Sequence, residues 1–245
     1  MFRNYMIRLT LRILIFLSIL YCYFFHYTWM ESIMDFKLLG KLTPLHLLWT
    51  VLMFGMLLHL FPQSKITMSG RKQLARTYQA PEEPYEEQEL LHYVKRMNVA
   101  ARQVMLGWLL LNLIFGVLYL YGIIGVAELF LLTMFFFISD LICILLFCPF
   151  QTFFMKNRCC VNCRIFDWGH FMMYTPMLFI KSFFSWSLFF TACIVLIRWE
   201  LSYAKHPERF WEGSNLTIRC ENCHDQICKL KKPLANLLCA RHQDN

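Results

Sequence analysis

The sequence predicts an all-α, polytopic integral membrane protein with four firm transmembrane helices, a fifth hydrophobic unit and a small Cys-rich cytoplasmic site. Hydrophobic residues make up 58% of the 245 residues and charged residues only 16%, whereas about a quarter of a soluble domain is charged. The apolar residues fall in runs long enough to cross a bilayer. The net charge of +8 lies mostly beside these runs, which favours a lipid bilayer over nucleic acid as the partner.

The N-terminal region, residues 1–61, holds a basic segment and the first two predicted spans. Three arginines in the first twelve residues precede or begin a span over 11–27, which predicts a cytoplasmic N-terminus. No small-residue cleavage site follows this run, so we interpret it as a retained span. The second span is predicted over 45–61, where Pro62 ends it because proline lacks the N–H that a helix needs.

The next region, residues 62–103, is predicted to be a basic cytoplasmic loop that contains an amphipathic helix. It holds seven lysines and arginines. Within it, residues 85–103 form the predicted helix, because Leu90, Val94 and Met97 fall on one face at helical spacing. We expect this helix to lie in the membrane interface and lead into the next span. The alternative is a dedicated surface for a protein partner.

Residues 104–148 are predicted to form a transmembrane helical hairpin. Its spans cover 104–121 and 127–147, and the glycine-containing turn at 122–125 joins them. The chain then follows an in-out-in-out-in path from a cytoplasmic start. The Cys-rich loop at 149–170 is therefore expected in the cytoplasm.

The fifth hydrophobic unit, residues 171–198, has two interpretations. A single span has the required length of about 20 residues, and it would place the Cys-rich basic tail at 199–245 outside. A re-entrant hairpin, broken near Pro176 or around 181–187, would return the tail to the cytoplasm. Non-helical backbone at membrane depth requires burial in protein or a wet cavity. The basic charge of the tail favours the hairpin, so we expect a cytoplasmic C-terminus.

Two Cys-x-x-Cys motifs flank this unit, and we predict that they form one metal site. Cys160 and Cys163 in the loop, with Cys220 and Cys223 in the tail, supply the four thiolates that tetrahedral zinc prefers. The 56 residues between the motifs exceed the spacing of a compact zinc ribbon. A shared site therefore requires the fifth unit to return to the same side. Additional candidate ligands are Cys159, Cys228 and His224.

The favoured function is a multi-pass membrane protein whose loop and tail are clamped together by structural zinc, with no assigned reaction. An iron–sulfur cluster or a redox-active dithiol on the same cysteines would instead indicate a membrane redox protein. If the tail lay outside, its cysteines would face an oxidising compartment and could form disulfides.

Ionisable residues in the apolar runs suggest two further chemistries. Asp140 lies inside a predicted span, where a charge is costly, so it predicts a small transporter or channel that uses Asp140 and Lys181. The alternative is a structural Asp140 that is partnered by Asn112 or Lys181. His26 and His46 lie near the outer ends of the first two spans, where they could ligate haem. Haem is the least favoured cofactor, because interfacial histidines are more often solvated or hydrogen-bonded.

The sequence Asp-Trp-Gly-His at 167–170, just before the fifth unit, could line the mouth of a re-entrant loop. The alternative is an interfacial belt. The sequence contains no Gly-rich phosphate loop, serine-nucleophile elbow or His-Glu-x-x-His helix. Whether the protein is an enzyme is therefore left open by its motifs.

Overall fold

The computed structural model describes residues 2–28, 44–60, 75–82, 84–157, 163–219 and 222, and this part of the chain contains helices and no strand. The α-helices are α1 (Phe2–Phe25), α3 (Pro44–Leu60), α5 (Glu87–Leu120), α6 (Val126–Leu145), α7 (Gly169–Tyr174) and α8 (Phe183–Lys205). The shorter elements are the 3₁₀ helices η1 (Ala75–Thr77), η3 (Phe166–Trp168), η4 (Thr175–Phe179), η5 (Pro207–Phe210) and η6 (Leu216–Ile218), and the π-helix η2 (Phe150–Met155).

Four helices in the described residues are long and apolar enough to cross a membrane: α1, α5, α6 and α8. The prediction of an all-helical chain with four such helices is therefore confirmed, but the set differs from the predicted one. The second predicted span corresponds to α3, which has only 17 residues. The fifth predicted unit, residues 171–198, overlaps α8, which extends to Lys205, has 23 residues and is long enough.

Helix α5 joins two predicted elements into one. Its 34 residues include both the amphipathic helix predicted at 85–103 and the third predicted span, and its length is about 51 Å at 1.5 Å per residue. Tyr93 and Met97 in its N-terminal half are buried in a hydrophobic cluster with Trp199 and Phe210. The apolar stripe of the predicted amphipathic helix therefore packs within the chain, where Tyr93 on the same part of α5 contacts Phe210 of η5 and Trp211 after it.

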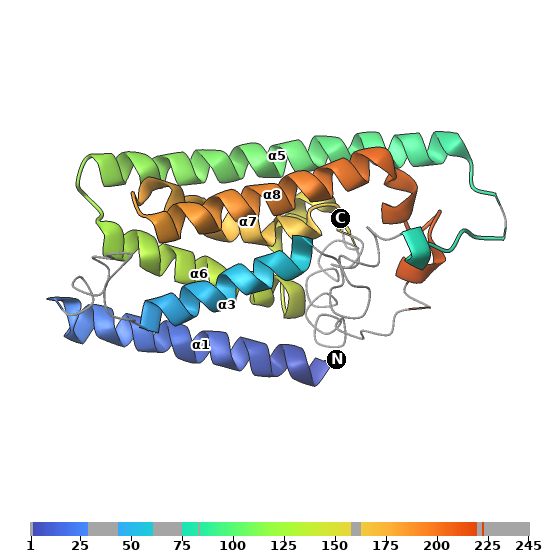
Figure 1. Cartoon of the computed structure of the whole chain (residues 1–245). Helices are drawn as coiled ribbons and strands as arrows, with labels where there is room; N and C mark the ends of the chain where they lie inside the picture. Colours follow the sequence, from blue (N-terminus) through green and yellow to red (C-terminus); the bar gives the residue numbers. More distant parts are fainter. Residues whose placement is uncertain are drawn as a thin grey trace, which may run out of the picture.

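The long helices form a bundle with two distinct ends (Figure 1). At the turn end, residues 121–125 join α5 to α6, and Gly122 has the positive φ of 70° that the turn requires. We call the opposite end the Arg164 end. Helices α1 and α6 are antiparallel, because Leu9 shares a cluster with Leu145 near the Arg164 end while the Tyr23 hydroxyl donates to Glu128 near the turn end.

Helices α3 and α8 run parallel to each other, from the turn end to the Arg164 end. The Trp49 indole N–H donates to the Ser187 hydroxyl near the start of both helices, over 2.9 Å. The Arg198 guanidinium donates to the carbonyl of Leu60, the last residue of α3. This arginine satisfies one of the carbonyl groups that the end of a helix leaves without an intrahelical partner.

The segment from η3 to α8 reverses direction inside the bundle. Elements η3, α7 and η4 carry the chain from the Arg164 end to the turn end, where the ring of Phe179 lies against Gly116 of α5. The chain reverses at residues 180–182, and α8 returns. Cys163, just before the segment, therefore lies in one hydrophobic cluster with Phe210, which follows it. A re-entrant hairpin is usually built from two short half-helices. Here the returning arm is instead the full-length helix α8.

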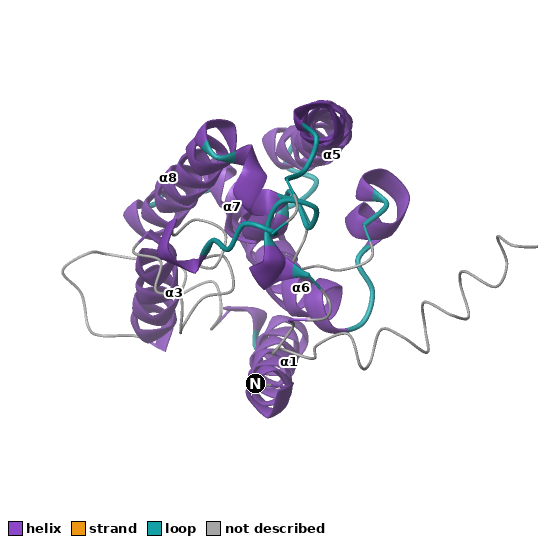
Figure 2. Ribbon diagram, turned by 90° about the vertical axis from the view of Figure 1, so that its right-hand side faces the viewer, coloured by secondary structure: helices purple, strands orange, loops and turns teal. Residues whose placement is uncertain are grey.

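The outgoing arm occupies the centre of the bundle, and Figure 2 shows α7 surrounded by α3, α5, α6 and α8. Pro176 in this arm has no N–H and interrupts regular α-helix, so the chain continues as 3₁₀ helix. The polar groups released by this irregular backbone are partly satisfied by side chains. The Trp108 indole N–H donates to the Thr175 hydroxyl over 3.2 Å, and that hydroxyl donates to the Phe171 carbonyl over 2.7 Å.

Gly116 tests the packing of the outgoing arm on α5, because a Cβ at this position would collide with the ring of Phe179. We expect Gly116→Ala to destabilise the protein by about 1–3 kcal/mol, the usual cost of overpacking. Gly107→Ala on the same helix is the matched control, since a Cβ there meets no atom within 4 Å. Helix propensity should make it neutral or stabilising by up to about 1 kcal/mol. Thermal unfolding in detergent, followed by circular dichroism, measures both variants, and equal effects would contradict this packing.

Candidate functional site

Five ionisable side chains converge in the half of the bundle toward the Arg164 end, and we call them the polar cluster. They come from five different elements, so only the tertiary fold assembles them. The cluster consists of Arg12 from α1, His59 from α3, Asp140 from α6, Asp167 from η3 and His170 from α7.

The first pair in the polar cluster joins α1 to α6. Arg12 Nη1 lies 3.1 Å from Asp140 Oδ2, and it also donates to the Phe137 carbonyl over 2.5 Å. The guanidinium carbon lies 4.1 Å from the centre of the Phe137 ring. The side chains of Arg12 and Asp140 are only 19% and 27% exposed, so each offsets the cost of removing the other from water.

This pairing differs from the partners that the sequence suggested for Asp140. Asn112 instead donates from Nδ2 to the Trp108 carbonyl, over 2.9 Å within α5. Lys181 is exposed in the reversal between η4 and α8, at the turn end. Asp140 is therefore paired with Arg12, and a transport role that uses both Asp140 and Lys181 stays a prediction.

Gly169 sets how closely α7 approaches this pair. A Cβ at position 169 would lie 2.5 Å from Asp140 Oδ1, which is far inside van der Waals contact. Asp140 Oδ2 faces Arg12, whereas Oδ1 lies beside the backbone of α7. The absence of a side chain at Gly169 thus lets the backbone of α7 lie against the Asp140 carboxylate.

The second part of the polar cluster links α3 to η3 and α7. His59 Nδ1 lies 2.9 Å from Asp167 Oδ1, and the Asp167 side chain is only 2% exposed. The rings of His59 and His170 meet edge to face with their centres 4.5 Å apart. His170 Nδ1 is buried without a hydrogen-bond partner in the described part of the chain. His59 therefore contacts both Asp167 and His170, while Asp140 lies against Arg12 and the backbone of α7 at Gly169.

The sequence indicates some members of this cluster but not how they meet. Asp140 stands out as a costly charge, and the sequence leaves Asp167 and His170 open between the mouth of a re-entrant loop and an interfacial belt. Arg12 was counted only among the N-terminal positive charges. Its position inside the first apolar run, 128 residues before Asp140, was the available signal, because a charge in such a run requires a partner.

A second polar network fixes the loop before η3 to the end of α8. Arg164 donates from both terminal nitrogens to the Glu200 carboxylate, and the Trp168 indole N–H donates to the same carboxylate over 2.7 Å. The Trp199 indole N–H donates to the Arg164 carbonyl over 2.8 Å. The Arg164 guanidinium carbon lies 3.7 Å from the centre of the Tyr203 ring, a favourable cation–π geometry. This network anchors the base of the hairpin.

The predicted metal site lies mostly outside the described residues. Cys163 is buried at 5% exposure beside the network around Arg164. Among the described residues, no group of three or more His, Cys, Asp or Glu side chains could hold a metal ion. The remaining predicted ligands lie outside the described ranges: Cys159, Cys160, Cys220, Cys223, Cys228 and His224.

The two histidines considered for haem have different surroundings. His26 is exposed just after α1, with its ring centre 5.9 Å from that of Tyr21. His46 packs edge to face on Phe184 at the start of α8, with ring centres 5.0 Å apart. Each ring thus packs beside an aromatic residue, and haem remains an untested prediction.

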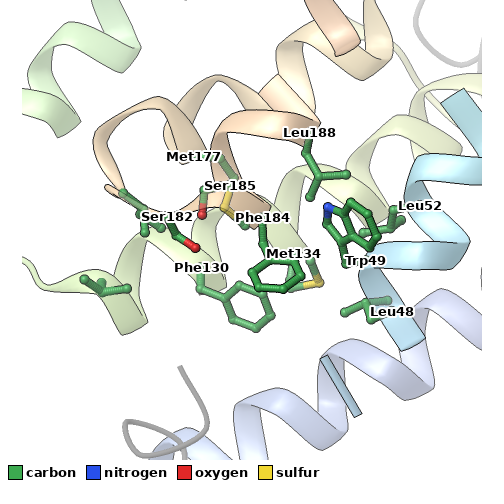
Figure 3. Close-up of a pocket in the computed structure, with 12 residues that line it drawn as sticks. Leu48, Trp49, Leu52, Phe130, Met134, Met177, Ser182, Phe184, Ser185 and Leu188 are labelled. Carbon is green, nitrogen blue, oxygen red and sulfur yellow. The ribbon is translucent and has the colours of Figure 1, made fainter. Parts of the chain in front are cut away.

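Two of the cavities in the described part of the bundle bear on the site. The smaller, of about 60 Å³, is near the turn end, and apart from Ser182 and Ser185 its lining is apolar or aromatic (Figure 3). It contains no ionisable group, so we assign it no chemistry. The larger, of about 420 Å³, lies between α5 and α6 toward the Arg164 end, and Asp140 is the one carboxylate among the described residues that line it.

Comparisons with protein-family models, with curated proteins and with solved structures found no match. The functional argument therefore rests on the chemistry of the polar cluster and of the cavity beside it. Both contain Asp140, which makes this carboxylate the centre of the candidate site.

The Arg12–Asp140 pair can be tested by a double-mutant cycle. Arg12→Gln leaves a carboxylate without its cation inside the bundle, so we expect it to destabilise more than the double variant Arg12→Gln/Asp140→Asn. The coupling energy should be about 1–3 kcal/mol. Chemical unfolding in detergent measures it. The control is Arg12→Gln combined with Glu128→Gln. Glu128 lies 12 residues before Asp140 on α6 and accepts a hydrogen bond from Tyr23. That control pair should be additive, and additivity at Asp140 would contradict the ion pair.

Proposed function

We propose that the chain is a polytopic membrane protein in which the polar cluster relays protons between the cytoplasm and Asp140. The full spans are α1, α5, α6 and α8. Helix α3 and the arm from Phe166 to Phe179 are shorter crossings. The rise per residue of α and 3₁₀ helix gives each of these two a length of roughly 25 Å, close to the hydrocarbon thickness of about 30 Å.

The distribution of charge supports a cytoplasmic Arg164 end. Among the described residues near the turn end, Lys181 is the one lysine or arginine. Positive residues instead gather toward the other end, where they would follow the positive-inside rule. They include Arg8, Lys95, Arg96, Lys156, Arg164, Lys205, Arg209 and Arg219.

The length of α5 supports the same orientation. At about 51 Å it exceeds the hydrocarbon by roughly 20 Å, so its N-terminal part would extend into the cytoplasm. That part packs with Trp199, Tyr203 and Phe210 in one cluster. The cluster would form a small cytoplasmic platform directly below the bilayer.

The single observation that carries the proposed relay is the gathering of ionisable groups from five elements inside the bundle, the polar cluster. Asp140 lies five residues before the end of α6, or about 7.5 Å along the helix axis. His59, which contacts Asp167 and His170, lies with it in the half of the bundle toward the Arg164 end. Ionisable groups at membrane depth are costly and mark ion or proton pathways by default.

The members of the polar cluster have distinct chemical roles in this proposal. His59 accepts and releases protons, since imidazole is the side chain best suited to do so near neutral pH, and the ring of His170 packs edge to face against it. Asp167 orients the His59 ring through Nδ1, and Arg12 holds the Asp140 carboxylate in place. The relay requires water to bridge those members that are not in contact. The function is therefore a proton-coupled transporter or proton channel centred on Asp140.

The relay predicts proton movement across a membrane that depends on Asp140. The full chain in liposomes, with a pH-sensitive dye inside and an imposed potential, measures this flux. We expect Asp140→Asn and His59→Gln each to lower the rate by about tenfold or more, the low end of the contribution of a positioned proton-transfer group. Glu128→Gln is the matched control, because it neutralises a carboxylate on the same helix near the turn end. Flux that is unchanged by Asp140→Asn, or lost equally in Glu128→Gln, would exclude the relay.

The predicted zinc clamp is a second candidate function, and the reversal of the hairpin supports it. The returning α8 brings the chain that precedes the tail motif into the same cluster as Cys163. A site shared by Cys160, Cys163, Cys220 and Cys223 would thus need no crossing of the bilayer. Such a clamp would reinforce the network around Arg164 at the base of the hairpin.

Metal analysis of the purified full chain tests the clamp. We expect about one zinc per chain, and an equal loss of metal and of stability in Cys163→Ser and Cys223→Ser, since removing either ligand opens the same site. Cys193→Ser in α8 is the control that should retain the metal. Iron with sulfide would instead favour the redox protein. Unequal effects of the two ligand variants would argue against a shared site.

A further inference from the structure

The larger cavity has the size and position of a binding site that is open to the bilayer. Its volume of about 420 Å³ falls in the range of roughly 300–1,000 Å³ that is usual for small-molecule sites. Phe135 and Ile142 of α6 belong to its lining, and these side chains are 54% and 36% exposed. The mouth therefore lies on the outer surface of the bundle, where the proposed bilayer would be. A ligand would enter from lipid.

The lining selects a polarisable and largely apolar ligand. Trp108 and Phe136 lie with their ring centres 4.7 Å apart, and Phe150 meets Trp108 edge to face at 6.1 Å. Sulfur atoms of Cys143 and Met173 complete the wall. Aromatic rings and sulfur make their best contacts with the faces and edges of another ring, which favours a planar ring over a flexible chain.

Asp140 supplies the polar end of the cavity. Its carboxylate is 27% exposed, and although Oδ2 accepts from Arg12, a carboxylate has about four acceptor positions in all. Arg12 already neutralises the charge of Asp140. A ligand ammonium would therefore add an uncompensated cation to a low-dielectric site, which is costly. A neutral donor such as a hydroxyl adds a hydrogen bond without that cost.

We propose that this cavity binds a lipid-soluble planar ring that carries a hydroxyl group, with the hydroxyl donating to Asp140 and the ring lying against Trp108 and Phe136. The ligand enters from the bilayer past Phe135 and Ile142. The inference rests on the proposed function only in placing this half of the bundle within a membrane. Binding requires neither His59 nor His170.

A matched pair of probes tests the hydroxyl. The probes are 6-bromo-2-naphthol and 2-bromo-6-methylnaphthalene, which differ only in a hydroxyl or a methyl group, and whose bromine quenches tryptophan fluorescence on contact. Trp108→Phe, measured on the full chain in phosphatidylcholine vesicles, isolates the signal of Trp108. We expect saturable quenching of Trp108 by the naphthol. Affinity for the methyl analogue should be about tenfold or more weaker, because a hydrogen bond to a charged group is lost.

Two serine variants test the place of binding. Ser139 lines the cavity, and its hydroxyl donates to the carbonyl four residues earlier. Ser139→Phe should fill the mouth and weaken naphthol binding about tenfold or more. Ser18 on α1 makes the same bond to its own helix but does not line the cavity, so Ser18→Phe should bind normally. Circular dichroism checks that both variants fold, and the probe pair on the unaltered chain decides the outcome if Ser139→Phe does not.

Three results would overturn this proposal: equal affinity for the two probes, naphthol binding that is indifferent to a folded Ser139→Phe variant, or strong quenching of Trp108 by phospholipids with brominated acyl chains. The last result would mean that a lipid chain fills the cavity. Proton flux through the same vesicles, measured without a probe, separates the two hypotheses. If proton flux is intact and the naphthol does not bind, the ligand site alone is rejected. If proton flux is lost and the naphthol still binds, the relay alone is rejected.

Discussion

The structure depends on one constraint: the irregular backbone from Phe166 to Phe179 must be enclosed by other helices. In the proposed membrane, a 3₁₀ segment with a proline leaves polar backbone groups that lipid would not satisfy, so this arm would be tolerated only inside protein. The bundle meets the constraint with close contacts from α5. Gly116 of α5 receives the ring of Phe179, and Trp108 donates to Thr175. The long helices are thus arranged around the least regular element, and α8 is free to return along its flank.

The same arm brings charge into the bundle, and the surrounding helices compensate for it. Asp167 enters with the arm and meets His59 from α3, while Gly169 lets α7 touch Asp140, which Arg12 of α1 neutralises. The central element and the outer helices α1, α3 and α6 are therefore joined by polar contacts as well as by apolar packing. Removing a single member leaves its partner charged or unbonded in a poorly solvated place. Because its members depend on one another for charge and hydrogen bonding, we propose the polar cluster as the functional centre.

The difference in length between the helices shapes the Arg164 end of the bundle. Helix α5 is about 51 Å long, whereas α3 has 17 residues, so the Arg164 end extends beyond the short elements. The protruding part of α5 packs on η5, which follows α8, and the pair of Arg164 and Glu200 anchors the loop before η3 to α8. Between α5 and α6, η2 and the outgoing arm separate the two helices and leave the cavity that Asp140 borders. One carboxylate thus serves both the cluster and the cavity.

The sequence by itself determined that the described chain is helical, that four of its helices are long and apolar enough to cross a membrane, and that a turn lies at 122–125, because apolar runs and glycine are local signals. It also narrowed the fifth unit to two alternatives. The tertiary structure decided that the chain reverses at residues 180–182 and that Asp140 pairs with Arg12 instead of Lys181. Residues 12 and 140 are far apart in the chain, and no local pattern records which helices will become neighbours. That choice is made by packing, when the bundle encloses the one arm that requires enclosure.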